Sequence, residues 1–161
     1  MNKVHYSSKS DEWQTPKELF DEYDKIYNIQ LDAAATKENA LCKNYFTKED
    51  DALKQDWSKY KYIWLNPPFG RIISKFIKKA YEESLKNCIV VCLIPGRVDT
   101  SYFHNYILPY ARIIYIRGRL KFINRLLPSY RENGDFKLSP APFPSMIVIF
   151  GEKMMDKFRK F

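Results

Sequence analysis

Four consecutive residues, Asn66-Pro67-Pro68-Phe69, carry groups that could hold a planar amino group. Each proline lacks a backbone N–H, so no N–H of Pro68 competes for the Pro67 carbonyl. Asn66 precedes a proline and is held extended, which sets its side-chain oxygen beside that carbonyl. Phe69 adds an aromatic face next to the two acceptors. The run predicts a site for the exocyclic amine of an unstacked base or for a primary amide, with a simple turn as the alternative.

A helix start near the N-terminus is the second candidate. Thr15 is predicted to cap this helix, Pro16 to occupy its first position, and Glu18 to complete a capping box. Backbone N–H groups at such a start favour an anion such as a carboxylate. A cap that binds no ligand explains the same residues equally well, so both interpretations stay open here.

Two further apolar runs end in unusual residues. The run 29–33 leads into Asp32-Ala33-Ala34, and the run 88–94 leads into Pro95-Gly96-Arg97. In an open parallel sheet, ligands collect at the carboxyl ends of the strands. Asp32 is therefore expected to bind a ligand or to cap the next turn, and Arg97 to contact a phosphate or to support Asn66.

The elements that would position these residues alternate along the chain. Helices are expected after Pro16, over 72–85 and over 101–108, where the last one stops before Pro109. Strands that are apolar on both faces and alternate with amphipathic helices predict a single α/β domain, 1–161, with a mostly parallel sheet covered on both sides. Residues 1–12 are polar and expected to be flexible. The predicted strands are Ile29–Ala33, Asn44–Phe46, Tyr62–Leu65, Cys88–Ile94, Arg112–Arg117 and Met146–Phe150.

A long segment, residues 118–144, joins the last two predicted strands in place of a helix. Basic side chains alternate in it with aromatic and aliphatic ones, which suits a nucleic-acid backbone and the wedging of bases. A solvated insertion is the alternative. The basic candidates in and beside this loop are Arg117, Arg119, Lys121, Arg125 and Arg131.

Composition narrows the remaining classes of protein. The chain has 27 Lys and Arg against 19 Asp and Glu, and its net charge of +8 favours an anionic partner. No apolar run approaches the ~20 residues that span a bilayer, and the N-terminus lacks the apolar stretch of a secretory signal. The three cysteines and two histidines show no spacing typical of a zinc site or a disulfide framework. We expect a reduced, cytoplasmic protein with neither a metal nor a membrane partner.

Several segments follow one another in a recognisable order. Besides 66–69 they are Trp13–Pro16, Leu31–Ala35, Asn39–Thr47, Asp56-Trp57, Pro95–Thr100, Phe103-His104, Gly118–Phe122 and Ala141–Ser145. In this order they resemble the small phage-type, Dam-like DNA N6-adenine methyltransferases over nearly the whole chain. The chain departs from the wider superfamily in having no glycine-rich turn, and Asp32-Ala33-Ala34 stands in its place.

The resemblance implies a Rossmann-like class I methyltransferase with an antiparallel last strand, which acts on double-stranded DNA in a bacterial host cell. It implies S-adenosyl-L-methionine as cofactor and residues 66–69 as the catalytic motif, with the amine held by Asn66 and Pro67 and stacked on Phe69. A homodimer stays open. The implied cofactor contacts are Trp13, Thr15, Pro16, Asp32 for the ammonium, Ala33, Ala34, Asp50 or Asp51 for the ribose, Asp56 for the adenine, and Asn66.

Other functions fit the same motif. Methylation of cytosine at N4 uses an equivalent amine, although a serine commonly replaces Asn66 in those enzymes. Methylation of a protein glutamine uses the same nitrogen chemistry, and a basic nucleic-acid-binding domain without activity is the non-enzymatic alternative. Binding of S-adenosylmethionine would separate the enzymes from that last alternative, and the identity of the methylated nucleoside would separate adenine from cytosine.

Overall fold

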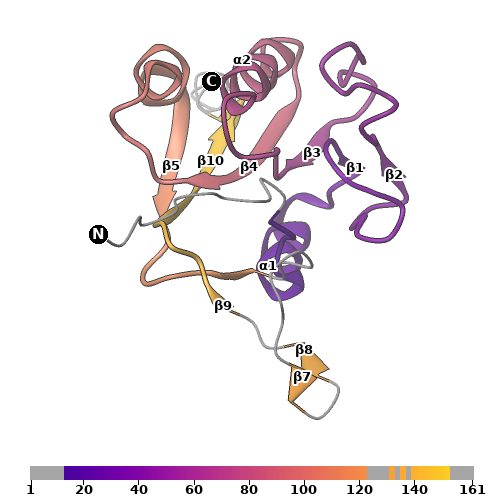
Figure 1. The fold of residues 1–161 in the computed structure, drawn as a ribbon. Helices are drawn as coiled ribbons and strands as arrows, with labels where there is room; N and C mark the ends of the chain where they lie inside the picture. Colours follow the sequence, from indigo (N-terminus) through magenta and orange to yellow (C-terminus); the bar gives the residue numbers. More distant parts are fainter. Residues whose placement is uncertain (1–12, 123–130, 133–134, 137–138, 153–161) are drawn as a thin grey trace.

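A mixed sheet forms the centre of the molecule (Figure 1). The computed structural model describes residues 13–122, 131–132, 135–136 and 139–152. Within these residues the main sheet has six strands in the order β2-β1-β3-β4-β10-β5. The mostly parallel sheet predicted from the apolar runs is confirmed. The strands are β1 (Leu31–Asp32), β2 (Asn44–Tyr45), β3 (Tyr62–Leu65), β4 (Ile89–Pro95), β5 (Ala111–Tyr115) and β10 (Ser145–Phe150).

The last strand runs against its neighbours. β10 pairs antiparallel with both β4 and β5, whereas β1 pairs parallel with β2 and β3, and β3 pairs parallel with β4. Every residue of β4 and β10 is buried, because each strand lies between two others and under both covering layers. The antiparallel last strand implied by the resemblance is present.

Two longer helices lie on opposite faces of the sheet. α1 (Lys17–Tyr27) packs Phe20 edge-on against Trp64 of β3 at 5.4 Å between ring centroids. α2 (Ile73–Ser84) contacts Phe150 of β10 through Tyr81. Phe150 pairs with Val90 while Trp64 pairs with Val91, and successive strand residues point to opposite faces, so α1 and α2 cover different faces (Figure 1).

The helix predicted over 101–108 differs in its form and its end. It consists of η1 (Phe103–Ile107), a π-helical turn, followed by the short α3 (Leu108–Tyr110). Pro109 lies inside α3, whereas the sequence predicted that the helix would end before Pro109. A proline is tolerated there because the first N–H groups of a helix have no intrahelical acceptor. No helix of the described residues is long and apolar enough to cross a membrane.

Residues 118–144 contain short strands, which corrects the expectation of a plain loop. β6 (Lys121–Phe122) pairs antiparallel with β9 (Ser139–Pro140), and β7 (Arg131–Glu132) pairs with β8 (Asp135–Phe136). Figure 1 shows the β7–β8 pair lying away from the main sheet. The β6–β9 pair fixes the position of Phe122, whose side chain is 1% exposed.

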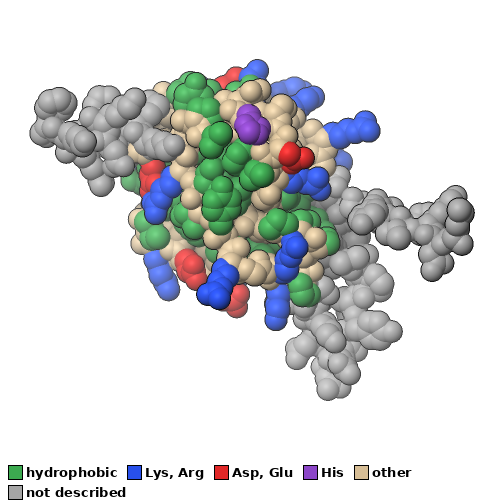
Figure 2. Space-filling model, turned by 90° about the vertical axis from the view of Figure 1, so that its left-hand side faces the viewer, with side chains coloured by type: hydrophobic (Ala, Val, Ile, Leu, Met, Phe, Trp, Pro, Cys, Tyr) green, Lys and Arg blue, Asp and Glu red, His purple; other side chains and the backbone are tan. Residues whose placement is uncertain are grey.

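β5 forms one edge of the sheet, and Figure 2 views the molecule from that side. Hydrophobic side chains gather in a band on this face, with Lys and Arg side chains around it. The exposed apolar residues of β5 and α3 include Leu108, Tyr110 and Tyr115. This side of the molecule therefore offers both apolar and basic surface.

Candidate active site

The predicted catalytic motif and several of the predicted cofactor residues lie at the carboxyl edge of the parallel strands. Asp32 pairs with Trp64, and the N–H of Ala33 donates to the Trp64 carbonyl at 2.9 Å. Asn66 follows β3 directly, so it lies at the same edge as Asp32. This arrangement is the one expected when ligand residues follow neighbouring parallel strands.

The side chain of Asn66 has one orientation. Its amide nitrogen donates to the backbone carbonyl of Trp13 and, at 3.0 Å, to the hydroxyl of Thr15. A carbonyl can only accept, so turning the amide over would set two acceptors against each other. The Asn66 oxygen Oδ1 is buried and has no hydrogen-bond partner among the described residues. A buried acceptor of this kind is costly unless a donor reaches it, and an amino group is such a donor.

Thr15 does not cap the helix, which corrects the predicted capping box. Pro16 occupies the N-cap position in an extended conformation instead of the first helical position, and no side chain bonds the helix end. The Thr15 hydroxyl accepts from the indole N–H of Trp64 at 3.3 Å and from Asn66. The hydroxyl makes these contacts in place of the local cap, and they join the N-terminal segment to β3 and to the residue that follows it.

Phe69 is covered, whereas the sequence predicted an open face for stacking. Its ring is 6% exposed and meets Phe122 and Phe143 edge-on, at centroid distances of 6.2 and 5.5 Å. Trp13 packs edge-on against the same two rings, at 5.6 and 5.2 Å. Burying an aromatic ring against other rings stabilises it relative to water, which explains the cover. Sequence reasoning missed the contact of Phe122 and Phe143 with Phe69, since only their aromatic character was visible.

Asp32 is a buried acid without a cationic partner among the described residues. Its carboxyl group accepts from the N–H of Leu41 at 3.2 Å and of Ala34 at 3.5 Å, and it is 3% exposed. Burial raises the pKa of Asp32 to about 7, against the lowering effect of these two bonds. Ala33 is fully buried, and Ala34 is half-buried. A cation would lower this pKa, so Asp32 suits an ammonium group.

Asp50 lies just beyond the carboxyl end of β2 and is exposed. Its carboxylate accepts from the backbone N–H and the hydroxyl of Thr47, at 2.7 and 2.8 Å, and these bonds lower the pKa of Asp50. Asp50 is therefore ionised at neutral pH and belongs to the loop that follows β2, the strand beside β1.

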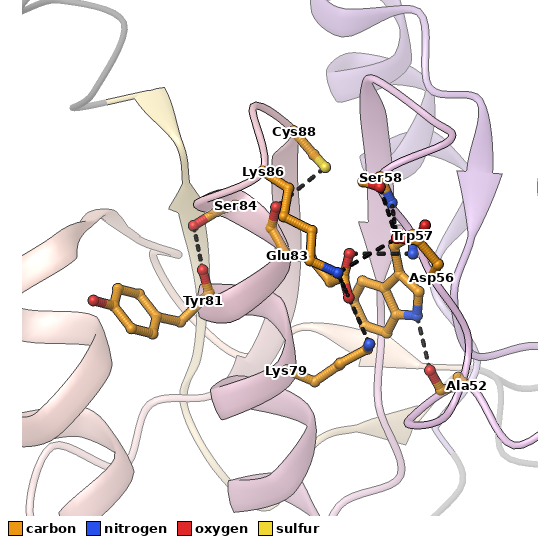
Figure 3. A network of polar contacts seen from close by, with 10 residues as sticks. All are labelled: Ala52, Asp56, Trp57, Ser58, Lys79, Tyr81, Glu83, Ser84, Lys86 and Cys88. Carbon is orange, nitrogen blue, oxygen red and sulfur yellow. Dashed lines mark hydrogen bonds and ion pairs between the residues drawn. The ribbon is translucent and has the colours of Figure 1, made fainter.

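The structure does not bring Asp56 to this edge. Asp56 bonds Ser58 and pairs with Lys86 at 3.4 Å, as Figure 3 shows. Asp56 precedes β3 and Lys86 precedes β4, so the pair lies at the amino ends of these strands, opposite to Asn66. The neighbouring Trp57 is fully buried and donates to the Ala52 carbonyl at 2.8 Å. Asp56 is therefore bonded at the opposite edge of the sheet from Asn66, and this position does not support the implied contact with the adenine of the cofactor.

Several basic candidates share the carboxyl edge of the sheet. Pro95, the last residue of β4, pairs with Ser145, and the N–H of Ile116 donates to the Ser145 carbonyl at 3.2 Å. Arg97 and Arg117 therefore follow two strands that end on either side of the start of β10. Both are exposed, as are Arg119 and Lys121, and none of these four forms an ion pair within the described residues. Arg125 and the side chain of Arg131 lie outside the described residues.

Comparison with known proteins assigns the family. A family model described as DNA N-6-adenine-methyltransferase (Dam) matches residues 3–157. The chain belongs to the DNA N-6-adenine-methyltransferase family. The family resemblance predicted from the ordered motifs is thereby confirmed, and every predicted site residue lies in the matched range.

Phage proteins are among the relatives of this family. The chain is 37% identical over 111 residues to the "DNA N-6-adenine-methyltransferase" of Escherichia phage T1, over 68% of this chain and 46% of that relative. It is 30% identical over 149 residues to the protein of the same name from Haemophilus phage HP1 (strain HP1c1), over 91% of this chain and 82% of that relative. A "Putative methyltransferase YfdM" of Escherichia coli (strain K12) is 38% identical over 50 residues, 30% of this chain and 55% of that protein. The chain thus spans about half the length of the T1 relative.

The side chains at this edge are of kinds that bind organic groups. Among the described residues, no group of three or more His, Cys, Asp or Glu side chains could hold a metal ion. The groups gathered at the edge are an amide oxygen, a buried carboxyl group and aromatic rings. The two oxygen-bearing groups match hydrogen-bond donors such as an amino group.

Proposed function

We propose that this chain transfers the methyl group of S-adenosyl-L-methionine to the N6 amine of an adenine turned out of double-stranded DNA. The observation that carries the proposal is the buried Asn66 Oδ1, which has no partner among the described residues while the amide nitrogen is bonded twice. The family match and the phage relatives support the same activity. The strand order and the antiparallel β10 support a Rossmann-like class I methyltransferase fold.

Asn66 and Pro67 accept the two N–H groups of the adenine amine. The lone pair of that amine is delocalised into the ring, so the nitrogen is a poor nucleophile. Two acceptors draw electron density onto nitrogen and favour a tetrahedral geometry, and this stabilisation grows towards the transition state. The Pro67 carbonyl is suited to the second bond because Pro68 has no N–H. No strong base is needed before attack, because the proton becomes acidic only after the nitrogen is methylated.

The residues beside Asn66 are suited to the cofactor. S-adenosyl-L-methionine, when bound, supplies a methyl group on a positively charged sulfur. Asp32 holds the ammonium group of its amino-acid end, since this carboxyl group is buried and faces no cation among the described residues. The carboxylate group of the cofactor lies at the start of α1, where unpaired backbone N–H groups favour an anion. Asp50 is the candidate for the ribose hydroxyls, because it is ionised and follows the neighbouring strand.

Base entry requires the aromatic cover to move. Phe122 and Phe143 meet the ring of Phe69, on which the adenine stacks in this proposal. A base that displaces them replaces one set of ring contacts by another, so the exchange costs less than exposing Phe69 to water. The exposed Arg97, Arg117, Arg119 and Lys121 bind the phosphates of the duplex.

Methylation of DNA by the whole chain tests the proposal. Duplex DNA is incubated with labelled S-adenosylmethionine and digested, and the nucleosides are identified by mass spectrometry. We expect N6-methyladenine from the wild-type chain and a rate about 10²–10³-fold lower for Asn66→Ala, by analogy with other lost transition-state hydrogen bonds. Asn105→Ala is the matched control, because Asn105 is exposed on η1.

Each alternative predicts a different product. N4-methylcytosine would assign the cytosine activity, and labelled protein without labelled DNA would assign glutamine methylation. Absence of S-adenosylmethionine binding in calorimetry would leave a nucleic-acid-binding domain. A rate for Asn66→Ala close to that of the control would refute the role of the amide.

A further inference from the structure

We propose that Thr15 is a positioning residue: its hydroxyl, held by the Trp64 indole, keeps the oxygen of the Asn66 amide directed at the amine that is methylated. This inference rests on the function proposed above and extends it to a residue for which the sequence predicted a cap and a cofactor contact. Its experiment includes a measurement that does not depend on activity.

The hydroxyl of Thr15 stands between two donors. Trp64 Nε1 lies 3.3 Å from Thr15 Oγ1, and Asn66 Nδ2 lies 3.0 Å from it. An indole nitrogen can only donate, so the hydroxyl uses one of its lone pairs for Trp64. The other lone pair then receives the Asn66 N–H. Thr15 therefore presents an acceptor to the nitrogen end of the amide.

The Trp13 carbonyl acts in the same direction. It receives the second N–H of Asn66, and the two contacts together occupy the whole amino end of this amide. Turning the amide over would bring its oxygen against the Trp13 carbonyl, and the Thr15 hydroxyl would then have to donate to that oxygen instead of accepting from the amide nitrogen. The N-terminal segment thus fixes which end of Asn66 faces Trp13 and Thr15 and which end stays unpartnered.

The indole of Trp64 fixes the position of the Thr15 hydroxyl. Trp64 is fully buried in β3, where Phe20 and Tyr23 of α1 pack against it. Its Nε1–H cannot reach water, so it needs a partner inside the protein, and the structure gives it Thr15. The orientation of Asn66 is thereby tied to the packing of α1 on the sheet. Alignment of reacting groups is worth a large factor in rate, and small misplacements are costly.

Thr15→Val and Thr15→Ser separate positioning from cofactor contact. Valine has nearly the shape of threonine without the hydroxyl, whereas serine keeps it. We expect Thr15→Val to lower kcat about 10- to 100-fold, with the cofactor Kd and the KM for DNA changed about twofold at most, since the variant loses only the restraint on the orientation of Asn66. We expect Thr15→Ser to restore most of kcat.

A double variant makes the test sharper. In an Asn66→Ala background the hydroxyl has no amide to orient, so adding Thr15→Val is expected to cause no further loss of kcat. An equal fold loss in both backgrounds would overturn the proposal, and so would an increase in the cofactor Kd at unchanged kcat. Thermal melting of each variant checks that the fold is retained.

Nuclear magnetic resonance gives a readout without turnover. In ¹⁵N-labelled protein, the side-chain amide pair of Asn66 is assigned by its absence from Asn66→Ala. We expect slow proton exchange for this pair in the wild type, and one proton that exchanges faster and shifts in Thr15→Val. An amide pair unchanged by Thr15→Val would overturn the positioning role alone, whereas absence of methyladenine from wild-type reactions would overturn the proposed function.

Discussion

Asp32 combines burial with a proposed function that needs its charge. Its carboxyl group is 3% exposed, and burial raises the pKa of Asp32 to about 7. The unfolded chain releases this proton near its ordinary value of 3.8, so the folded protein holds an extra proton between pH about 4 and about 7. The contribution of Asp32 to stability therefore falls as the pH rises through this window.

Asp32→Asn tests this titration. Asparagine has the shape of a protonated aspartic acid but keeps only one of the two acceptor oxygens that bond the N–H groups of Leu41 and Ala34, so the variant should lose stability by an amount that does not depend on pH. At pH 8 burial also disfavours the ionised wild-type side chain, so the free energy of unfolding of the variant relative to the wild type should be higher at pH 8 than at pH 5. Urea unfolding at both pH values measures the difference. An equal difference at pH 5 and pH 8 would show that Asp32 does not titrate in this range.

Cofactor binding provides the second half of the same test. If Asp32 holds an ammonium group, the ionised form binds, and the affinity of the wild type should rise as the pH increases through about 7. The variant should bind weakly at every pH. Calorimetry in buffers of different ionisation enthalpy would also detect the proton that the wild type releases on binding. A pH-independent affinity of the wild type would speak against the contact.

At the scale of elements, two aromatic residues from the chain between β5 and β10 cover Phe69 of the predicted catalytic motif. Phe122 lies on β6, and Phe143 lies between β9 and β10. Both rings touch Phe69, and both also touch Trp13. The cover therefore joins the N-terminal segment to the last part of the chain, and its displacement by a base must change the surroundings of Trp13.

The fluorescence of Trp13 should report this displacement. On addition of substrate DNA we expect a change in tryptophan emission, because Trp13 loses its contacts with Phe122 and Phe143. Trp57 and Trp64 are fully buried elsewhere and provide a constant background. Trp13→Phe should abolish the change, and Asn66→Ala should keep it. Normal methylation without any change in emission would contradict a moving cover.

At the scale of the molecule, the distribution of charge favours DNA at the carboxyl edge of the sheet. The chain carries a net charge of +8, and four exposed basic residues lie beside or beyond the ends of β4 and β5. They are Arg97, Arg117, Arg119 and Lys121. Phosphate contacts at this edge would bring the duplex to the end of β3, where the catalytic motif lies.

Arg119→Glu should weaken DNA binding and flatten its salt dependence. The loss of one phosphate contact lowers the slope of log K against log salt by about one. Fluorescence anisotropy with a labelled duplex, at several salt concentrations, measures both quantities. Lys25→Glu is the matched control. Lys25 is exposed in the last turn of α1, and its substitution makes the same change of charge away from the candidate site. Equal slopes for Arg119→Glu and the control would exclude Arg119 from the DNA surface.

Particular residues mark the limit of local reasoning. Helical spacing sets Glu83 among the charged side chains of α2, yet it is 1% exposed and accepts from the backbone N–H of Trp57 (Figure 3). The spacing shows the faces of α2 but not the loop that packs on one of them. The sequence predicted Thr15 as a cap because only its neighbours were visible, whereas its actual partners lie about 50 positions away.

The sequence alone determined the order along the chain of the main-sheet strands and the two longer helices, the layered α/β class and the place of the predicted catalytic motif after β3. These properties depend on runs of apolar residues and on the chemistry of an amide beside two prolines, and both are local. Tertiary structure decided the orientation of the Asn66 amide, the burial of Phe69 and the distance of Asp56 from the site. Each of these depends on which distant segments dock together, and the energy of docking has no signature in neighbouring residues.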